Sequence, residues 1–255
     1  MNYGARHFFE LLWGMTEKEL RARYKYTIFG FLWLVVNPLL QMLIIGFVFS
    51  FFMKEPVEHY YYFLFTGLLV WNFFSTSLSK ATPSIVYERS LIKKAMFPRA
   101  IIPLSIIVSN AVNFIVALIL LIIPLSSIGT LSLTTLPYIV GATGFLVMFT
   151  TGLSLLTCAL NVRFRDINFL VQAMLLVWFY ATPIVYSLSQ MPRSLLWIWR
   201  FNPLTCILQL YQHALLGAAA PGPAMLASNI GVMLLITAVG ILVFNDESKT
   251  FDDWV

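Results

Sequence analysis

The sequence predicts an all-α integral membrane protein with six transmembrane helices, and three observations carry that prediction. First, 60% of the 255 residues are hydrophobic and 11% are charged, whereas a soluble domain carries about 25% charged residues. Second, several long stretches contain no Asp, Glu, Lys or Arg. Third, the basic residues gather in alternate loops. This composition excludes a disordered chain, a secreted disulfide scaffold and an ordinary soluble enzyme.

Five stretches free of charged residues are long enough to cross a bilayer core, which requires about 20 apolar residues of helix. They are 26–53, 59–79, 100–162, 167–192 and 201–245. The third is about twice the length that one crossing needs, and the turn-rich segment Ser126–Pro137 divides it. The expected spans are therefore about 27–53, 60–80, 101–124, 137–160, 167–188 and 224–244, in a single domain covering 1–255.

The beginning of the fifth stretch is a poor candidate for a span. It contains several polar or helix-breaking residues, namely Asn202, Pro203, Gln209, Gln212 and His213, and it ends in GAAAPGP at 217–223. We therefore expect Phe201–Leu216 to form a re-entrant or interfacial helix before the last span.

The distribution of Lys and Arg predicts the orientation of the chain. With six spans, both termini and the second and fourth loops lie on one side of the membrane. All basic residues except Lys54, Arg193 and Arg200 fall on that side. Because an excess of Lys and Arg marks the cytoplasmic loops, both termini are expected to be cytoplasmic.

Several motifs that would indicate an enzyme or an ion-coupled transporter are missing from the sequence. No glycine is followed by lysine, so there is no Walker A loop for ATP, and neither HExxH nor CxxC offers a metal site. All carboxylates lie outside the expected spans, although backbone carbonyls can also bind sodium. Cys158 and Cys206 lie in apolar stretches and are interpreted as small buried hydrophobic residues. We expect no cofactor, metal or nucleic acid on this chain.

Residues 1–26 are expected to form an amphipathic cytoplasmic helix at the membrane surface. Thr16 and Glu19 have the T-x-x-E spacing of a capping box, so we expect a helix to begin at Thr16. The pairs Glu17 with Arg21 and Glu19 with Arg23 are spaced for i, i+4 ion pairs. The helix contacts a partner, anchors the chain at the membrane surface, or does both.

The second cytoplasmic loop, Ala81–Pro103, is too long for a simple turn. We expect a short helix from Ser84 to Met96, because Pro83 can open it and Pro98 cannot continue it. The alternative is that the basic residues of this loop only hold it on the cytoplasmic side. The fourth cytoplasmic stretch, NVRFRDI at 161–167, either orients the flanking helices or makes a functional contact.

Four motifs, taken in their order and spacing, give the chain a likeness to a known family. They are LRARYKYTIFGFLWLVVNPLL at 20–40, ERSLIKKAMFPRAIIPLS at 88–105, NVRFRDI at 161–167 and FNPLT at 201–205. Over essentially its whole length the chain resembles the transmembrane subunit of polysaccharide ABC exporters of the ABC-2 type. That group exports lipid-linked O-antigen, capsule and teichoic acid, and the motifs do not separate these substrates.

The resemblance implies a homodimer that binds two copies of a separate cytoplasmic ATPase subunit, which holds ATP and magnesium. It implies that the ATPase docks on the N-terminal helix and on the loop after the second span. The residues expected to serve coupling and gating are Glu88, Arg89, Leu91, Ile92, Lys93 and Lys94, with Glu17, Arg21 and Arg23 as secondary candidates. Leu91 and Ile92 would enter a groove of the ATPase. Phe201–Leu216 would correspond to the external gate.

The resemblance further implies that the first and fifth spans line the substrate channel, where aromatic rings suit sugars. The candidates are Phe29, Trp33, Trp71, Trp178, Phe179 and Tyr180. Aromatic residues in membrane helices more often pack or face lipid, so that alternative stays open for each. Lys93, Lys94 and Arg99 are candidates for holding a lipid pyrophosphate at the inner leaflet, or equally for anionic lipid.

The sequence thus predicts a transport subunit, not an enzyme, in the bacterial cytoplasmic (inner) membrane, where it moves a lipid-linked polysaccharide outward. One alternative is an ABC-2 exporter of drugs or small lipids. The other is an ATPase-independent channel or a membrane enzyme of glycolipid synthesis, and such an enzyme would need paired carboxylates or a metal site at the interface.

Overall fold

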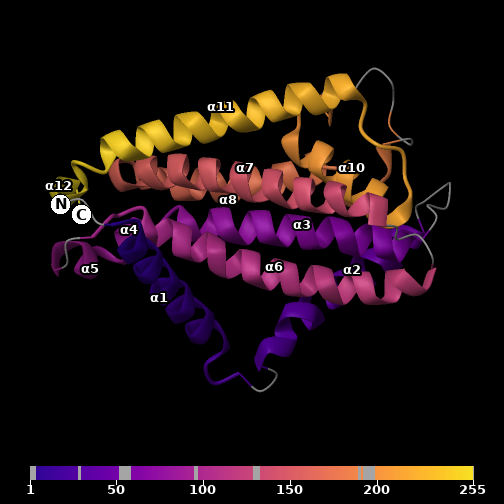
Figure 1. Ribbon diagram of the computed structural model, residues 1–255, viewed down its shortest axis with the longest axis horizontal. Helices are drawn as coiled ribbons and strands as arrows, with labels where there is room; N and C mark the ends of the chain where they lie inside the picture. The colour runs from indigo at the N-terminus through magenta and orange to yellow at the C-terminus, as the bar shows by residue number, and fades with distance from the viewer. Residues whose placement is uncertain are drawn as a thin grey trace.

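The computed structural model describes residues 4–27, 30–51, 59–94, 97–128, 133–188, 191 and 199–254. Throughout these residues the regular structure is helical, and the helices α3, α6, α7, α8 and α11 lie lengthwise in an elongated bundle, with α1 oblique to them (Figure 1). In chain order the helices are α1 Ala5–Tyr24, α2 Trp33–Ser50, α3 Tyr60–Ala81, α4 Ser84–Tyr87, α5 Arg89–Lys94, α6 Ile101–Ile128, α7 Leu136–Arg163, α8 Asp166–Ala181, α10 Pro203–Leu216, α11 Pro223–Glu247 and α12 Phe251–Trp254. Short 3₁₀ turns at Gly30–Leu32 and Leu133–Thr135 precede α2 and α7.

The helices α3, α7 and α11 run in the same direction. The Phe74 ring stacks on Phe149 at 5.7 Å between centroids, and further along both helices Thr82 and Thr157 share a hydrogen bond of 2.9 Å. The helices α7 and α11 are also parallel. Thr237 of α11 contacts Met148 of α7, and further along both helices Glu247 contacts Arg163.

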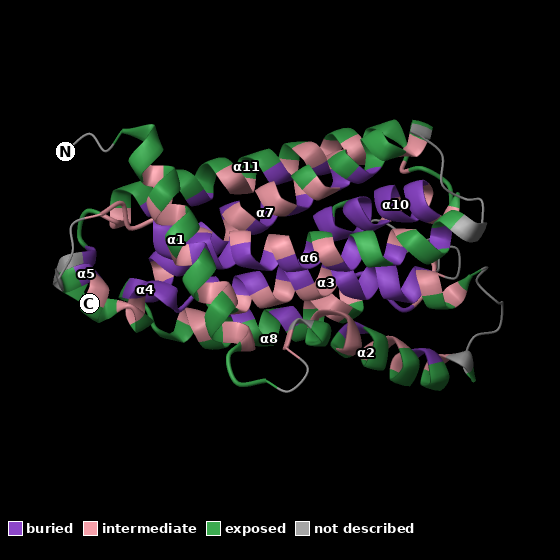
Figure 2. Ribbon diagram, turned by 60° about the horizontal axis from the view of Figure 1, so that its bottom comes forward, coloured by how far each residue is buried: buried purple, intermediate pink, exposed green. Residues whose placement is uncertain are grey.

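The helices α2, α6 and α8 run in the opposite direction to α3. For each of them, the residue number of the partner falls as the number in α3 rises. The contacts, with the residue of α3 given first, are Tyr61 with Gly46 and Asn72 with Gln41 for α2, Phe73 with Phe114 and Ser77 with Asn110 for α6, and Trp71 with Phe179 and Ser79 with Gln172 for α8. The two chain ends lie at the same end of the long axis as α4 and α5 in both views (Figures 1 and 2). This alternation is the arrangement that six crossings with both termini on one side require.

Among the described residues, three helices are long and apolar enough to cross a membrane: α7, α11 and the segment Ile101–Ser126 of α6. The helices α2 and α8 are apolar but shorter. Large apolar side chains of α11, such as Leu235 and Leu242, are 64% and 68% exposed, and Figure 2 shows this outer surface. Lipid is the solvent that suits such a surface, so the chain is a multi-pass membrane protein.

A close approach of backbone holds α11 against α7. A Cβ atom added at Gly240 would lie 2.0 Å from the Gly152 carbonyl oxygen, and one added at Gly152 would lie 2.4 Å from Thr237 Cα. Only glycine leaves room for this contact. Small residues at helix contacts of this kind let membrane helices pack closely without any hydrophobic driving force.

The expected helix start at Thr16 is wrong. The first helix begins at Ala5, and Thr16 is fully buried in its middle, where its hydroxyl donates to the Leu12 carbonyl at 2.8 Å. A threonine inside a helix bonds back to residue i−4 in this way. The preceding residues favour helix and include the i, i+4 pair Arg6 and Glu10, so the capping-box spacing was coincidental.

Other boundaries also differ from those expected. The helix predicted from Ser84 is two short helices, because the backbone at Glu88 leaves the helical region with φ −92° and ψ 27°. The helix of the predicted span 167–188 ends at Ala181, since Thr182 precedes a proline and is extended. The predicted first span, 27–53, is α-helical only from Trp33 to Ser50, after the 3₁₀ turn at Gly30–Leu32, and its residues 28–29 and 52–53 lie outside the described part of the chain. Near the expected division at Ser126–Pro137, α6 ends at Ile128 and α7 begins at Leu136.

Candidate functional site

The side chains of Lys18 and Arg23 join the N-terminal helix α1 to other parts of the chain. Lys18 Nζ lies 2.8 Å from Glu88 Oε1, so α1 is joined to the break between α4 and α5. Near the end of α1, Arg23 donates from Nη2 to Asn110 Oδ1 in α6. Within α1 the predicted pair of Glu17 and Arg21 is present. The contact with the second loop is therefore made by Lys18, which was not among the residues predicted from the sequence, whereas the predicted residue Arg23 contacts α6.

The residues of α5 divide into outward-facing and inward-facing members. Arg89 and Lys93 are exposed and Leu91 is half-buried, whereas Ile92 is 7% exposed and belongs to an apolar cluster with Ile85 and Ile102. Ile92 therefore supports the loop from within, and Leu91 is the apolar side chain that α5 offers to the surface. The side chain of Lys94 and residues 95–96 lie outside the described part of the structure.

The C-terminal segment packs beneath the same loop. Phe251 of α12 is 1% exposed and joins the cluster that contains Ile92. Arg99 donates to the Ser248 carbonyl and lies 6.0 Å from the Phe251 ring centre. Arg99, which was expected to bind a pyrophosphate, therefore helps to hold the C-terminal segment in the structure. Sequence reasoning missed this packing, although the aromatic residues of FDDW so soon after the last span were a usable signal.

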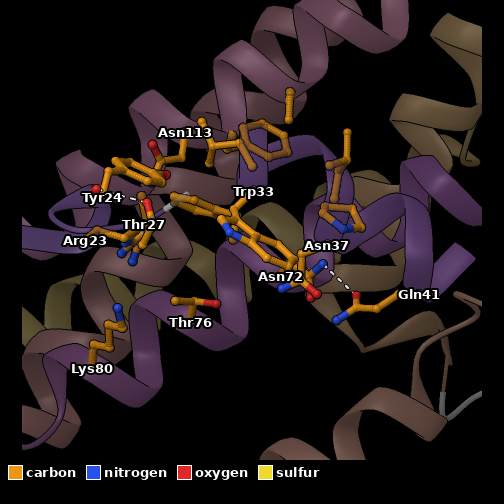
Figure 3. Close-up of a pocket in the computed structure, with 17 residues that line it drawn as sticks. Arg23, Tyr24, Thr27, Trp33, Asn37, Gln41, Asn72, Thr76, Lys80 and Asn113 are labelled. Carbon is orange, nitrogen blue, oxygen red and sulfur yellow. Dashed lines mark hydrogen bonds between the residues drawn. The ribbon is translucent and has the colours of Figure 1, made fainter. Parts of the chain in front are cut away.

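A cavity of about 510 Å³ lies between α1, α2, α3 and α6 (Figure 3). Each of the three long helices turns a stripe of polar side chains towards it. The stripes are Asn37 and Gln41 of α2, Asn72, Thr76 and Lys80 of α3, and Asn110 and Asn113 of α6. Residues three or four apart lie on one face of a helix, so the three stripes converge. Polar groups in membrane helices are costly and mark functional sites, which makes this cavity the candidate site.

Hydrogen bonds cross-link the wall of the cavity. Asn72 donates from Nδ2 to Gln41 Oε1 at 2.9 Å, and Asn110 donates from Nδ2 to Ser77 Oγ at 3.0 Å. Arg23 continues the second chain by donating to Asn110. Because Arg23 belongs to α1, the helix that also carries Lys18, the cavity wall and the α4–α5 loop are connected through one rigid element.

The aromatic candidates for the substrate path separate into two groups. Trp33 is 42% exposed and lines the cavity, near the centre of Figure 3. Trp71 and Phe179 contact each other at 5.3 Å between ring centres and line a neighbouring hollow with Ser75, Ser79, Lys80 and Gln172. Tyr180 is 63% exposed. Phe29 lies outside the described residues.

Trp178 is half-buried, as Trp71 and Phe179 are, and differs from the other aromatic candidates in its contacts. Its ring contacts Phe74 and Phe149 at 5.2 and 6.0 Å, and its indole N–H donates to Asn202 Oδ1 at 3.0 Å. Asn202 caps α10 by accepting from the Leu204 amide. These contacts favour a packing role for Trp178 over a position in the substrate path.

The polar stripes were not recognised in the sequence. Their spacing, N-x-x-x-Q in α2, N-x-x-x-T-x-x-x-K in α3 and N-x-x-N in α6, was the available signal. The residues predicted to line the substrate path were aromatic, and no amide was among them. In the described part of the chain, no group of three or more His, Cys, Asp or Glu side chains is placed to hold a metal ion, and Cys158 and Cys206 are buried free thiols.

A helical bundle that turns converging polar stripes to one cavity beside a surface loop defines a multi-pass membrane transport protein. Residues 10–216 match the ABC-2 type transporter family, and the chain belongs to that family. Two relatives, both called O-antigen export system permease protein RfbA and both from Klebsiella pneumoniae, are 34% and 32% identical over 255 and 256 residues, covering 98% of this chain and 97% of each relative. A protein of the same name from Myxococcus xanthus is 33% identical over 240 residues, 91% of this chain and 90% of its own length.

Proposed function

We propose that this chain is the transmembrane subunit of an ATP-driven exporter that moves a lipid-linked polysaccharide, of O-antigen, capsule or teichoic-acid type, outward across the bacterial cytoplasmic membrane. The observation that carries the proposal is the match to O-antigen export permeases over 98% of the chain. A match of that extent spans the segments that form the cavity, the α4–α5 loop and α10, and is not confined to one motif.

The proposal includes a homodimer with two copies of a cytoplasmic ATPase subunit that binds ATP and magnesium. The support lies at one end of the bundle, where α1, α4, α5 and the two chain ends gather (Figure 1). Exposed Arg89 and Lys93 flank the half-buried Leu91 on α5, a pattern that suits docking of an apolar anchor with charges around it. Glu88 and Lys18 then tie the docked helix to α1.

The proposed topology has six crossings, with both termini in the cytoplasm and α10 at the outer face. The opposite directions of α3, α7, α11 and of α2, α6, α8 support it, as does the concentration of Lys and Arg near α4, α5 and both ends. α10 has 14 residues, too few to cross about 30 Å of hydrocarbon, and it lies at the end of the bundle far from α5 (Figure 1). It therefore fits a re-entrant external gate.

In the proposed cycle, closure of the ATPase dimer on ATP pushes α5. The push passes through Glu88 and Lys18 into α1, and α1 pulls on Asn110 through Arg23. Because Asn110 belongs to the cavity wall, nucleotide state is coupled to the shape of the cavity. This is a rigid-body coupling between two distinct sites.

The test combines purification with a surface assay. The tagged chain is extracted from native membranes in mild detergent, its partners are identified by mass spectrometry, and surface glycan is measured after deletion of its gene. We expect a P-loop ATPase in near-equal amount, and loss of surface polysaccharide that the intact gene restores. A chain that purifies alone without ATPase activity, from cells whose surface glycan is unchanged, would contradict the proposal.

The amides and Trp33 of the cavity favour a sugar substrate over an apolar drug.

A further inference from the structure

The cavity between α1, α2, α3 and α6 carries positive charge. Arg23 and Lys80 both line it, and the described residues in its wall include no carboxylate. Figure 3 shows the two cationic side chains directed to the same part of the cavity. Glu19, whose charge also acts on Lys80, lines the adjoining hollow instead. Two cations brought together with amides and hydroxyls favour an anionic ligand, since without one their charges repel.

The donors in the cavity are of the kind that recognise phosphate. The Arg23 guanidinium has five N–H donors in a planar fork, and Asn110 accepts from its Nη2. A guanidinium binds two phosphate oxygens side by side, and the Lys80 ammonium adds a point charge. Burial raises the pKa of the Tyr24 hydroxyl, with Arg23 opposing the shift, so Tyr24 keeps its proton and remains a hydrogen-bond donor.

A buried amide lies in the same place. Asn113 is 5% exposed, and its side chain interacts with the Tyr24 hydroxyl. An amide has two N–H donors and a carbonyl oxygen with two acceptor positions, so one contact with Tyr24 leaves hydrogen-bonding capacity unused. A ligand that offers both acceptors and donors, as a sugar phosphate does, would satisfy the rest.

The other side of the cavity suits a sugar ring. Trp33 presents an indole that is 42% exposed, and Asn37 and Gln41 lie on the same helix one and two turns further along. Aromatic faces pack against the C–H surfaces of sugars, and amides bond their hydroxyls. Cations at one part of a cavity and an aromatic ring with amides at another match a phosphate joined to a sugar.

We propose that this cavity binds the phosphate-bearing headgroup of the lipid-linked glycan, with Arg23 and Lys80 on the phosphate oxygens and with Trp33 and Asn37 on the first sugar. The inference rests on the proposed function, because it names the ligand site of that exporter. The phosphate is therefore assigned to Arg23 and Lys80 in place of Lys93, Lys94 and Arg99. The Arg99 guanidinium already donates to the Ser248 carbonyl. The same phosphate chemistry is present in ordinary anionic phospholipids.

The experiment measures binding to the purified exporter in nanodiscs of zwitterionic lipid. The probes are a radiolabelled polyprenyl pyrophosphate, the same probe carrying one N-acetylhexosamine, the corresponding polyprenyl alcohol, and phosphatidylglycerol as competitor. We expect both pyrophosphates to bind, the sugar-bearing one more tightly, and the alcohol to bind at least about tenfold more weakly, as expected for loss of charge-assisted bonds. Displacement by phosphatidylglycerol at equal concentration would overturn the assignment and give the cavity to phospholipid.

Matched variants locate the site. Arg23→Gln and Lys80→Gln are each expected to weaken pyrophosphate binding by about tenfold or more, whereas Arg23→Lys retains most of it. The controls are Arg6→Gln in the same helix and Lys249→Gln, two cations outside the cavity that are paired with Glu10 and Asp246. Trp33→Ala is expected to remove the advantage of the sugar-bearing probe and leave binding of the bare pyrophosphate. Unchanged binding in both Gln variants would refute the site.

Failure of this site and failure of the proposed function give different results. If Arg23→Gln and Lys80→Gln bind the probes and export glycan normally, the exporter stands and the cavity assignment falls. If the wild-type chain has no ATPase partner and its deletion leaves surface glycan intact, the proposed function falls whatever the cavity binds. Each variant is checked for a monodisperse elution profile and an unchanged melting temperature. Arg23→Lys keeps the test valid if Arg23→Gln does not fold.

Discussion

Lys18 Nζ and Glu88 Oε1 lie 2.8 Å apart, 70 residues apart in the sequence, and join the N-terminal helix to the break between α4 and α5. The two side chains are 52% and 30% exposed, so the pair adds less than about 1 kcal/mol to stability. Its position matters more than its energy. It is a direct contact between the loop expected to meet the ATPase and the helix whose Arg23 contacts the cavity wall.

Reversal of one charge in this pair is predicted to uncouple transport from ATP hydrolysis. We expect Glu88→Lys to lower glycan export by about five- to thirtyfold, which corresponds to a coupling free energy of about 1 to 2 kcal/mol. The melting temperature should change little. The double variant Lys18→Glu with Glu88→Lys restores opposite charges and should recover part of the export. Export and ATPase activity measured together in proteoliposomes check this, and equal loss in the single and double variants would contradict it.

The two apolar residues of α5 are predicted to respond differently to a charge. Leu91→Asp should abolish co-purification of the ATPase while the permease still folds, because Leu91 is the apolar side chain that α5 offers to the surface. Ile92→Asp should destabilise the permease itself by about 3 kcal/mol or more, because Ile92 is buried with Ile85 and Ile102. Thermal melting and pull-down of each single variant separate the two effects. Normal ATPase recruitment by Leu91→Asp would contradict the docking role.

The close contact of Gly152 with Gly240 predicts that α11 tolerates a larger residue at Gly231 but not at Gly240. Gly240→Leu should destabilise the protein by about 3 kcal/mol or more, because its Cβ would meet the Gly152 carbonyl at 2.0 Å and backbone cannot move aside as a side chain can. Gly231→Leu is the matched control, since its Cβ would have nothing within 4 Å. Melting temperatures in detergent measure both, and equal effects would argue against this helix packing.

The helical bundle was predictable from the sequence because membrane spans depend on a single property, apolar length. The six expected spans overlap α2, α3, α6, α7, α8 and α11, and α10 falls within the segment expected to be re-entrant. Boundaries were less predictable. Thr16 was expected to cap a helix on local spacing alone, whereas the stretch from Ala5 had its own helical preference and buried Thr16 inside.

The candidate site was predictable in part. The coupling residues of the second loop were identified by resemblance, and the structure joins them to α1 through Lys18. The amide cavity was not identified, because its residues come from α2, α3 and α6 and nothing local in the sequence shows which helix faces meet. Arg23 and Lys80 are 57 positions apart, and only the antiparallel packing of α3 and α6 and the docking of α1 bring them to one cavity.

Asn202 is predicted to be a structural junction at the end of the bundle that carries α10. Its Nδ2 donates to the Ala181 carbonyl and to Thr182 Oγ1, and its Oδ1 accepts from Leu204 and from Trp178. Asn202→Asp keeps the acceptor but places a carboxylate oxygen against two acceptors, so it should destabilise by about 2 kcal/mol or more.

Trp178 tests the same junction from the other side. Trp178→Phe keeps a ring against Phe74 and Phe149 and loses the bond to Asn202, for which we expect about 1 kcal/mol of destabilisation. Export by this variant should fall only in proportion to the amount of folded protein. In contrast, Trp33→Ala should slow export more than it lowers stability, because Trp33 lines the cavity. A disproportionate loss of export in Trp178→Phe would return Trp178 to the substrate path.

The orientation of the bundle is predicted to place the two ends of the long axis in different compartments. Cysteine at Gly4, which precedes α1, should be protected from an impermeant thiol reagent added outside intact cells, and cysteine at Ala219, exposed between α10 and α11, should react. The native Cys158 and Cys206 are 0% and 1% exposed and should stay silent. Permeabilisation should then make the Gly4→Cys variant reactive, because the barrier to the reagent is the membrane and not burial. Labelling at Gly4→Cys before permeabilisation would show that the N-terminus lies outside. α5 would then be separated from cytoplasmic ATP by the membrane, so this result would also exclude the coupling route through Glu88 and Lys18.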